Sequence, residues 1–295
     1  MPIPDGPSRL DGWVEVPIPH LGPQEHLAKQ NQLEELKARA LRDSNRSLAA
    51  LFEEALKGLP DTGYSRLVSE ANHAQGWRVF QMDGVPCAEL EKASRRRIPS
   101  LPFEVNPSIF GNDVNRRDYW RPTRAVRVSD GWLVASNCGE FGAWLDWFGE
   151  QGESTYKISN DQVVDFVEVA GNLMVVEGLA HLGLTRGSLV KIVYAANRWI
   201  AEEVARLPAA PCMAISQGDS VLVVHGEGLL RSTASGAMTN LVRFPSLGRL
   251  YPNSAILDGQ KMYVGMRGYV WEVDLHHAKR RLLAPQQLSG TRPTT

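Results

Sequence analysis

The chain has 295 residues, of which 43% are hydrophobic and 22% charged, an ordinary composition for a globular protein. Its 32 Lys and Arg against 33 Asp and Glu leave a formal net charge of −1, which provides no global attraction to nucleic acid or an anionic membrane. No run of residues approaches the roughly 18 apolar residues of a membrane-spanning helix, and the first residues lack the apolar stretch of a signal peptide. The sequence therefore predicts a cytoplasmic protein with no nucleic-acid or membrane partner.

The first 122 residues are expected to form three segments. Residues 1–22 read as an extended arm, in which Trp13–Val16 alternates like one short strand at the edge of a sheet. Apolar residues recur at helical spacing over residues 23–60, which predicts one interrupted helix or a helical pair. Prolines interrupt residues 61–122, so this segment is expected to be irregular, with one or two strands including residues 76–80.

After Pro122 the chain repeats one layout four times. Each repeat contains a strand, a turn and a second strand, and the equivalent second strands begin near Trp132, Leu173, Val221 and Met262. These positions lie about 40 to 50 residues apart, which is the spacing of four-stranded propeller blades. A second hairpin follows the first in every repeat, as in Leu229–Thr233 and the segment after it.

The sequence thus predicts a mainly β protein with an α-helical N-terminal segment. Four clear blades of a β-propeller-like array occupy residues 123–285, and residues 286–295 are expected to be a flexible tail. A closed ring usually needs more than four blades, so five or more are expected in total. A fifth blade assembled from residues 76–120, together with Trp13–Val16, would close the ring.

Two segments resemble known bacterial propellers. Tyr251–Gly265 followed by Tyr269–Asp274 resembles blades of the broad group that includes NHL-type repeats and gluconolactonase-like proteins. Glu177–Gly183, with the sequence Glu-Gly-Leu-Ala-His-Leu-Gly, resembles a segment of uncharacterised bacterial propeller-like proteins. The resemblance covers about residues 123–285, lacks the Trp-Asp dipeptide of WD repeats, and implies a fold without implying an activity.

Aligning the repeats places a set of polar side chains toward one shared mouth of the propeller channel. These ligand-binding candidates are Arg124, Asp165, Glu177, His225, Asn253 and Arg267. The alternative is that they satisfy one another, Arg124 with Asp165 and Glu177 with His225, because buried polar groups are generally hydrogen-bonded.

A metal site is the weaker interpretation of the same region. The resemblance to gluconolactonase-like enzymes implies a divalent cation held by carboxylate and amide oxygens. The donors available for it are Glu177, Asn253, Asp165 and Asn137. The match is poor because His225 and Met266 occupy inner positions where a hard cation prefers oxygen, so no cofactor is expected and a divalent metal remains the alternative.

The three cysteines, Cys87, Cys138 and Cys212, are odd in number and widely spaced, which argues against a disulfide framework or a zinc site. We expect all three cysteines to be reduced and to serve as packing residues. A nucleophilic Cys138 activated by His181 or His225 is the less favoured alternative.

These observations favour a non-catalytic binding or interaction protein that uses a propeller-like face. A protein is the expected partner and a small molecule the alternative one, and a bacterial immunity protein that neutralises a partner toxin is one concrete form. The competing hypothesis is a metal-dependent hydrolase or lactonase with its site at the propeller channel.

Overall fold

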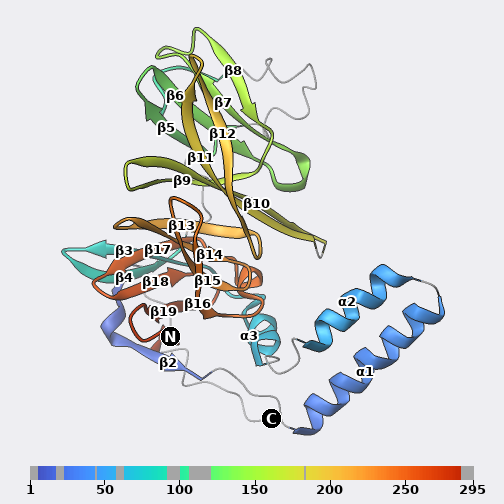
Figure 1. The fold of residues 1–295 in the computed structure, drawn as a ribbon. Helices are drawn as coiled ribbons and strands as arrows, with labels where there is room; N and C mark the ends of the chain where they lie inside the picture. The colour runs from blue at the N-terminus through green and yellow to red at the C-terminus, as the bar shows by residue number, and fades with distance from the viewer. Residues whose placement is uncertain are drawn as a thin grey trace.

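The computed structural model describes residues 6–17, 23–43, 45–57, 63–91, 100–105, 121–182 and 184–286. Within these ranges the chain is mainly β, and five antiparallel sheets form a propeller-like array (Figure 1). Three α-helices precede the main array: α1 (Pro23–Arg42), α2 (Arg46–Lys57) and α3 (Gly63–Ala71).

Each of the four predicted repeats forms one sheet, and we number these sheets blades 1 to 4. Blade 1 contains β5 (Arg124–Val128), β6 (Gly131–Asn137), β7 (Ala143–Phe148) and β8 (Thr155–Ser159). Blade 2 contains β9 (Val163–Val169), β10 (Asn172–His181), β11 (Leu184–Ala195) and β12 (Arg198–Leu207). Blade 3 contains β13 (Pro211–Gln217), β14 (Ser220–His225), β15 (Gly228–Thr233) and β16 (Met238–Arg243). Blade 4 contains β17 (Ser254–Asp258), β18 (Lys261–Gly265), β19 (Val270–Asp274) and β20 (Lys279–Pro285).

The N-terminal region supplies a fifth sheet and one extra strand. The N-terminal sheet contains β1 (Ser8–Arg9), β4 (Val85–Leu90) and β3 (Trp77–Met82), in this spatial order. The extra strand, β2 (Trp13–Val16), was predicted to join this fifth sheet. It pairs instead antiparallel with β20 and forms the outer edge of blade 4. The expected fifth unit is therefore present as a three-stranded sheet, in which residues 8–9 pair with β4, whereas β2 pairs with β20 of blade 4.

The blades stack because their middle strands, such as β6, β14 and β19, bury both of their faces. In β14, Val221 and Val223 pack with apolar residues of blade 2, whereas Leu222 and Val224 pack in a cluster that extends into blade 4. Successive side chains of a strand point to opposite faces, so an unbroken apolar run fits a sheet that is covered on both sides. The apolar runs of the repeats therefore reflect stacking of one blade on the next.

Helix α3 lies in a segment that was predicted to be irregular, and that prediction was wrong there. Leu67, Val68 and Ala71 recur at helical spacing and are buried in the core shared by blades 3 and 4. Residues 106–120 of the same segment and residues 287–295 of the expected tail lie outside the described residues.

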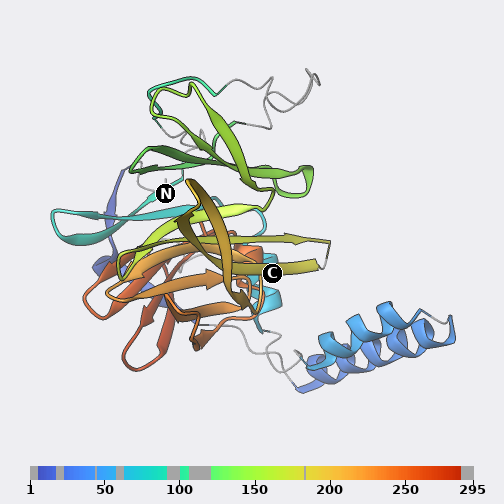
Figure 2. The same cartoon turned by 45° about the horizontal axis from the view of Figure 1, so that its top comes forward.

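The helical segment at residues 23–57 is a pair of helices, one of the two predicted alternatives. Lys37 of α1 lies 3.4 Å from Glu53 of α2, in an ion pair between the two helices. Both views show this helical hairpin to one side of the sheets and separated from them (Figures 1 and 2). None of the described helices has the length and apolarity needed to cross a membrane.

A close approach between blades 2 and 3 requires glycine at position 178. A Cβ atom there would lie 2.4 Å from both the Arg186 carbonyl oxygen and Pro211 Cδ. Gly178 belongs to the Glu-Gly-Leu-Ala-His-Leu-Gly segment singled out in the sequence. Its glycine therefore has a packing role at the start of β13.

Gly178→Ala is expected to destabilise the protein by about 1–3 kcal/mol, the usual cost of forcing an extra methyl group into a packed site. Urea unfolding measures this loss. Gly226→Ala is the matched control, because its Cβ would meet no atom closer than 3.8 Å, and it should change stability little. Equal effects of the two substitutions would contradict the close approach.

Residues 8–16 hold blade 4 and the N-terminal sheet together. Leu10, between β1 and β2, is buried in a cluster that includes Trp77 of the N-terminal sheet and Leu283 of blade 4. The rings of Trp13 and Trp77 meet edge to face at 4.8 Å, and Trp13 Nε1 donates to Ser8 Oγ. We call residues 8–16 the N-terminal clasp.

Leu10→Ala is expected to cost about 2–4 kcal/mol of stability, because it leaves a cavity in the clasp. Asp11→Ala, at the neighbouring exposed position, is the control and should stay within about 0.5 kcal/mol of the parent protein. Thermal and urea unfolding of both variants test this. A Leu10→Ala protein as stable as the control would show that the clasp is not packed.

Candidate functional site

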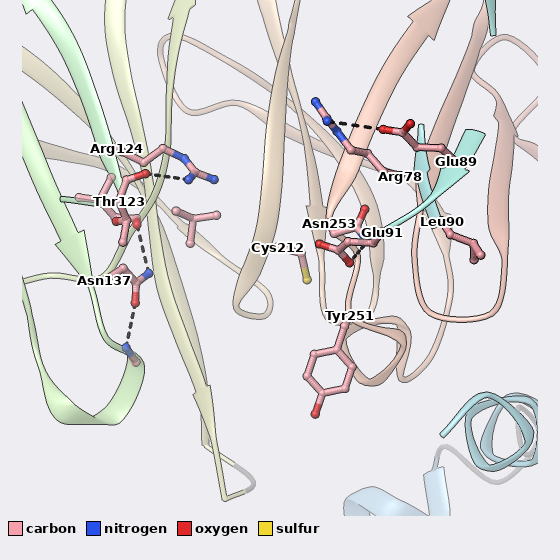
Figure 3. A pocket seen from close by; sticks show the side chains of 13 residues that line it. Arg78, Glu89, Leu90, Glu91, Thr123, Arg124, Asn137, Cys212, Tyr251 and Asn253 are labelled. Atoms are coloured by element: carbon pink, nitrogen blue, oxygen red, sulfur yellow. Dashed lines mark hydrogen bonds and ion pairs between the residues drawn. The ribbon is translucent and has the colours of Figure 1, made fainter. Parts of the chain in front are cut away.

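A cavity of about 860 Å³ lies where the inner strands of the blades begin. Its walls come from all four blades and the N-terminal sheet, so it occupies the centre of the array. We call it the mouth cavity (Figure 3). The lining residues are Arg78, Glu89, Leu90, Glu91, Thr123, Arg124, Asn137, Gly139, Val163, Val164, Cys212, Tyr251 and Asn253.

Arg124 forms the charged part of one wall. Its Nε donates to Asp165 Oδ1 at 3.3 Å, and its Nη1 donates to the Thr123 carbonyl at 3.0 Å. Burial raises the pKa of Asp165, and the charge of Arg124 opposes that rise. The pairing of Arg124 with Asp165 that the sequence suggested is present, and Arg124 still faces the cavity.

The N-terminal sheet and the start of β17 form a second charged wall. Arg78 Nη1 lies 3.8 Å from Glu89 Oε1, and Asn253 Nδ2 donates to Glu91 Oε2 at 2.9 Å. Figure 3 shows Arg78 and Arg124 on opposite sides of the cavity, with Cys212 between them. The cavity therefore presents guanidinium, carboxylate and amide groups together.

Two of the remaining lining residues have structural roles. Asn137 Nδ2 donates to the Val163 carbonyl, and its Oδ1 accepts from the Gly139 amide, so both ends of its amide are used. Burial raises the pKa of the Cys212 thiol to about 12, which keeps it protonated at neutral pH. A neutral thiol is a poor nucleophile.

Arg267 lies at the edge of the cavity and does not line it. Its guanidinium stacks over the ring of Tyr251 at 4.2 Å, and Tyr251 is 61% exposed. A cation over an aromatic face is a favourable arrangement that fixes both side chains. Arg267 therefore helps to hold the ring of Tyr251, which lines the mouth cavity.

Glu177 and His225 do not lie at the mouth and do not pair with each other. Along β10, Glu177 shares a face with Val175, which packs toward blade 1, whereas His225 shares a face of β14 with Val223, which packs toward blade 2. His225 Nδ1 accepts from the Glu227 amide at 3.2 Å. The repeat alignment considered only the positions of these residues along their strands and did not account for the face of the sheet.

The four weak metal candidates are not gathered in one place. Asn137, Asn253 and Asp165 lie around the mouth cavity, and Glu177 lines a different recess. Among the described residues no group of three or more His, Cys, Asp or Glu could hold a metal ion. A metal-dependent hydrolase stays a hypothesis.

For the alternative nucleophile, Cys138, the structure places the sulfur 3.5 Å from Ser136 Oγ, and its activation by a histidine stays a hypothesis. His181 Nε2 contacts Glu140 Oε2, and His225 is buried with its Nδ1 engaged by the Glu227 amide. None of the three cysteines forms a disulfide.

The site residues that sequence reasoning missed are Arg78, Glu89 and Glu91. They belong to a hairpin whose turn is Asp83-Gly84, with φ angles of 53° and 74°. An Asp-Gly pair between two strand-like runs is a strong hairpin signal, because both residues tolerate positive φ. That signal could have located the hairpin, although not its position at the cavity.

Exposed apolar side chains surround part of the mouth. Phe141 is 64% exposed, and Leu182 and Leu184, at the tip of the β10–β11 hairpin, are 91% and 59% exposed. The hairpin extends past its neighbours, because β9 ends its pairing with β10 at Glu177 (Figure 1). The His181–Glu140 contact joins this tip to the turn that carries Phe141. We call Phe141, Leu182 and Leu184 the apolar rim.

Comparison with known proteins gives only distant structural similarities. No family model matches the chain, and no curated protein matches it. The chain is 15% identical to the extracellular domain of a one component system from B. thetaiotaomicron, with a TM-score of 0.40 over 71% of this chain and 28% of that one. The AfRom2 CNH domain gives 9% identity and a TM-score of 0.41 over 68% of each chain. TolB from Acinetobacter baumannii gives 9% identity and a TM-score of 0.32 over 77% and 59%.

The chain thus spans little more than a quarter of the length of the first of these proteins. The resemblance to NHL-type and gluconolactonase-like blades stays a prediction, because no family model supports it.

The pH dependence of stability is expected to carry the signature of His225. Burial lowers its pKa to about 4, from an ordinary value near 6.5. The unfolded chain therefore binds more protons than the folded chain between these values, and stability falls as the pH decreases from about 6.5 to 4. The full loss from this residue is about 3 kcal/mol.

Urea unfolding of the parent and of His225→Leu at a series of pH values tests this expectation. The variant should lose that part of the pH dependence. An identical slope in both proteins would show that His225 does not titrate abnormally.

Proposed function

We propose that this protein is a non-catalytic binding protein that holds a protein partner on the mouth face of its propeller-like array. The observation that carries the proposal is the position of the apolar rim beside a hollow with charged walls. A projecting segment of the partner occupies the mouth cavity, and the rim covers the surface around that segment.

The chemistry of the mouth supports a protein ligand. Apolar contacts surrounded by polar groups are typical of protein interfaces, in which aromatic and arginine side chains provide much of the binding energy. The mouth offers Tyr251 and Phe141 as aromatic contacts, with Arg78 and Arg124 as guanidinium donors. Arg guanidinium groups bind carboxylates with two parallel hydrogen bonds, so an acidic side chain on the inserted segment fits these walls.

The array also provides the rigidity that such binding needs. The lining side chains lie at strand ends, and Arg124, Asn253 and Asn137 are held by hydrogen bonds within the protein. A preorganised surface loses little conformational entropy on binding. An immunity protein that binds and neutralises a toxin is one biological form of this activity.

A mouth variant is expected to lose the partner that the parent protein captures from extract of its host. Arg124→Glu and Leu182→Ser should each weaken binding of that partner about tenfold or more, because each removes a contact at the mouth. The affinity is measured with the purified partner by calorimetry.

Two control variants keep the mouth intact. Arg127→Glu alters an arginine of the same strand that pairs with Glu150, and Met238→Ser alters a residue that is 41% exposed at the turn between β15 and β16. Both should bind like the parent. A partner that is lost equally from mouth and control variants, or kept by all of them, would show that the mouth is not the binding face.

A further inference from the structure

A second hollow of about 240 Å³ lies in blade 2, separate from the mouth cavity. It is formed by the β8–β9 loop and by strands β10, β11 and β12, and we call it the Glu177 recess. Its lining residues are Asp161, Gln162, Glu177, Gly178, Arg186, Gly187, Ser188, Glu203 and Arg206.

The Glu177 carboxylate is the unusual group in this recess. Its side chain is buried, with the residue only 4% exposed, and its Oε1 has no hydrogen-bond partner in the structure. Ser188, its cross-strand neighbour, hydrogen-bonds to the carboxylate, so one side of the group is satisfied and the other is not. A buried carboxylate oxygen without a partner is costly, and such a group calls for a ligand or a functional explanation.

The charges around Glu177 favour a cationic ligand. Asp161, Glu177 and Glu203 provide three carboxylates against the two guanidinium groups of Arg186 and Arg206. Both arginines are engaged: Arg186 with Gln162 and Asp161, and Arg206 with Glu203. One negative charge is therefore left uncompensated when Glu177 is ionised.

The dimensions and donor set select the kind of cation. The recess is smaller than the roughly 300–1,000 Å³ of pockets that hold drug-sized ligands, so it fits the end group of a molecule. In the part of the chain that the structure describes, no cluster of three His, Cys, Asp or Glu residues could bind a metal ion. A primary ammonium group is small enough for the recess. It binds through three donated hydrogen bonds and needs no cluster of metal ligands.

We propose that the Glu177 recess binds a primary ammonium group, which donates a hydrogen bond to the free oxygen of the Glu177 carboxylate. Asp161 and Glu203 add electrostatic attraction, and the amide oxygen of Gln162 and the hydroxyl of Ser188 are further polar groups on the walls. The source of the ammonium group is either a free amine or a lysine side chain of a protein.

Binding at this recess is linked to proton release. Burial and the nearby charge of Asp161 raise the pKa of Glu177 to about 7, and Arg186 opposes this rise. The other charged groups facing the carboxylate are Glu203, which also raises the pKa, and Arg206 at the recess wall. Because the ammonium group binds the ionised carboxylate, affinity increases with pH up to the pKa of the amine itself.

The test is a titration of the full chain with n-butylammonium chloride, followed by calorimetry at pH 6 and pH 8. The fraction of ionised Glu177 rises from about one tenth to nine tenths between these values, so binding should tighten about tenfold. NMR of the protein labelled with ¹³C at the glutamate carboxyl groups should show a lower pKa for Glu177 when the amine is bound. Tetramethylammonium, which has no N–H donor, should bind at least tenfold more weakly.

Variants assign the effect to the recess. Glu177→Gln should abolish butylammonium binding, whereas Glu168→Gln, at an exposed position of the same sheet, should leave it unchanged. If Glu177→Gln fails to fold, Glu203→Gln provides the second test and should weaken binding several-fold. Tighter binding of Nα-acetyl-lysinamide than of butylammonium indicates a lysine side chain as the source, and the reverse indicates a free amine.

Equal binding of tetramethylammonium would overturn the proposal, as would a Glu177 pKa that saturating butylammonium leaves unchanged. Either result would show that the Glu177 carboxylate does not receive a hydrogen bond from an ammonium group.

Discussion

The pairing of residues 8–16 with two different sheets is the constraint on which the rest of this architecture depends. The four repeats stack on one another through apolar runs, but the N-terminal sheet has no repeat sequence to place it. The clasp joins it to blade 4 through β1, β2 and the buried Leu10. Backbone hydrogen bonds from Trp77 to Met266 and from Gly268 to Gln75 complete the attachment. The position of Arg78 and Glu89 at the mouth therefore follows from contacts between residues that lie far apart in the sequence.

The repeats were predictable because their information is local. Alternation, turn residues and repeat spacing are properties of neighbouring residues, and all eight hairpins expected in residues 123–285 are present. The mouth position of Arg124 and Asn253 was predictable for the same reason, since both lie at the start of an inner strand. The assignment of β2 to blade 4 was not, because pairing between Val14 and Ala284 joins opposite ends of the chain and leaves no local signal.

Glu177 and His225 show a second limit of sequence reasoning. Their places along β10 and β14 were inferred from the register of the repeats, but a one-residue difference in register exchanges the two faces of a strand. Both side chains are buried between blades. Burial raises the pKa of Glu177 and lowers the pKa of His225, which in each case favours the neutral form. The polar groups of this protein thus divide into an open set at the mouth and a buried set between blades, and the two sets differ in their chemistry.

The antiparallel pairing of β2 with β20 also has a consequence for synthesis. The ribosome releases Trp13–Val16 long before Lys279–Pro285, so β2 must wait until blade 4 has been made before its partner strand exists. During that interval its backbone donors and acceptors are an open strand edge, which is the kind of surface that recruits other chains. Contacts of such long sequence separation also form slowly. The mouth cavity is therefore a late product of folding, because its walls include the N-terminal sheet and the region next to blade 4, which the clasp joins.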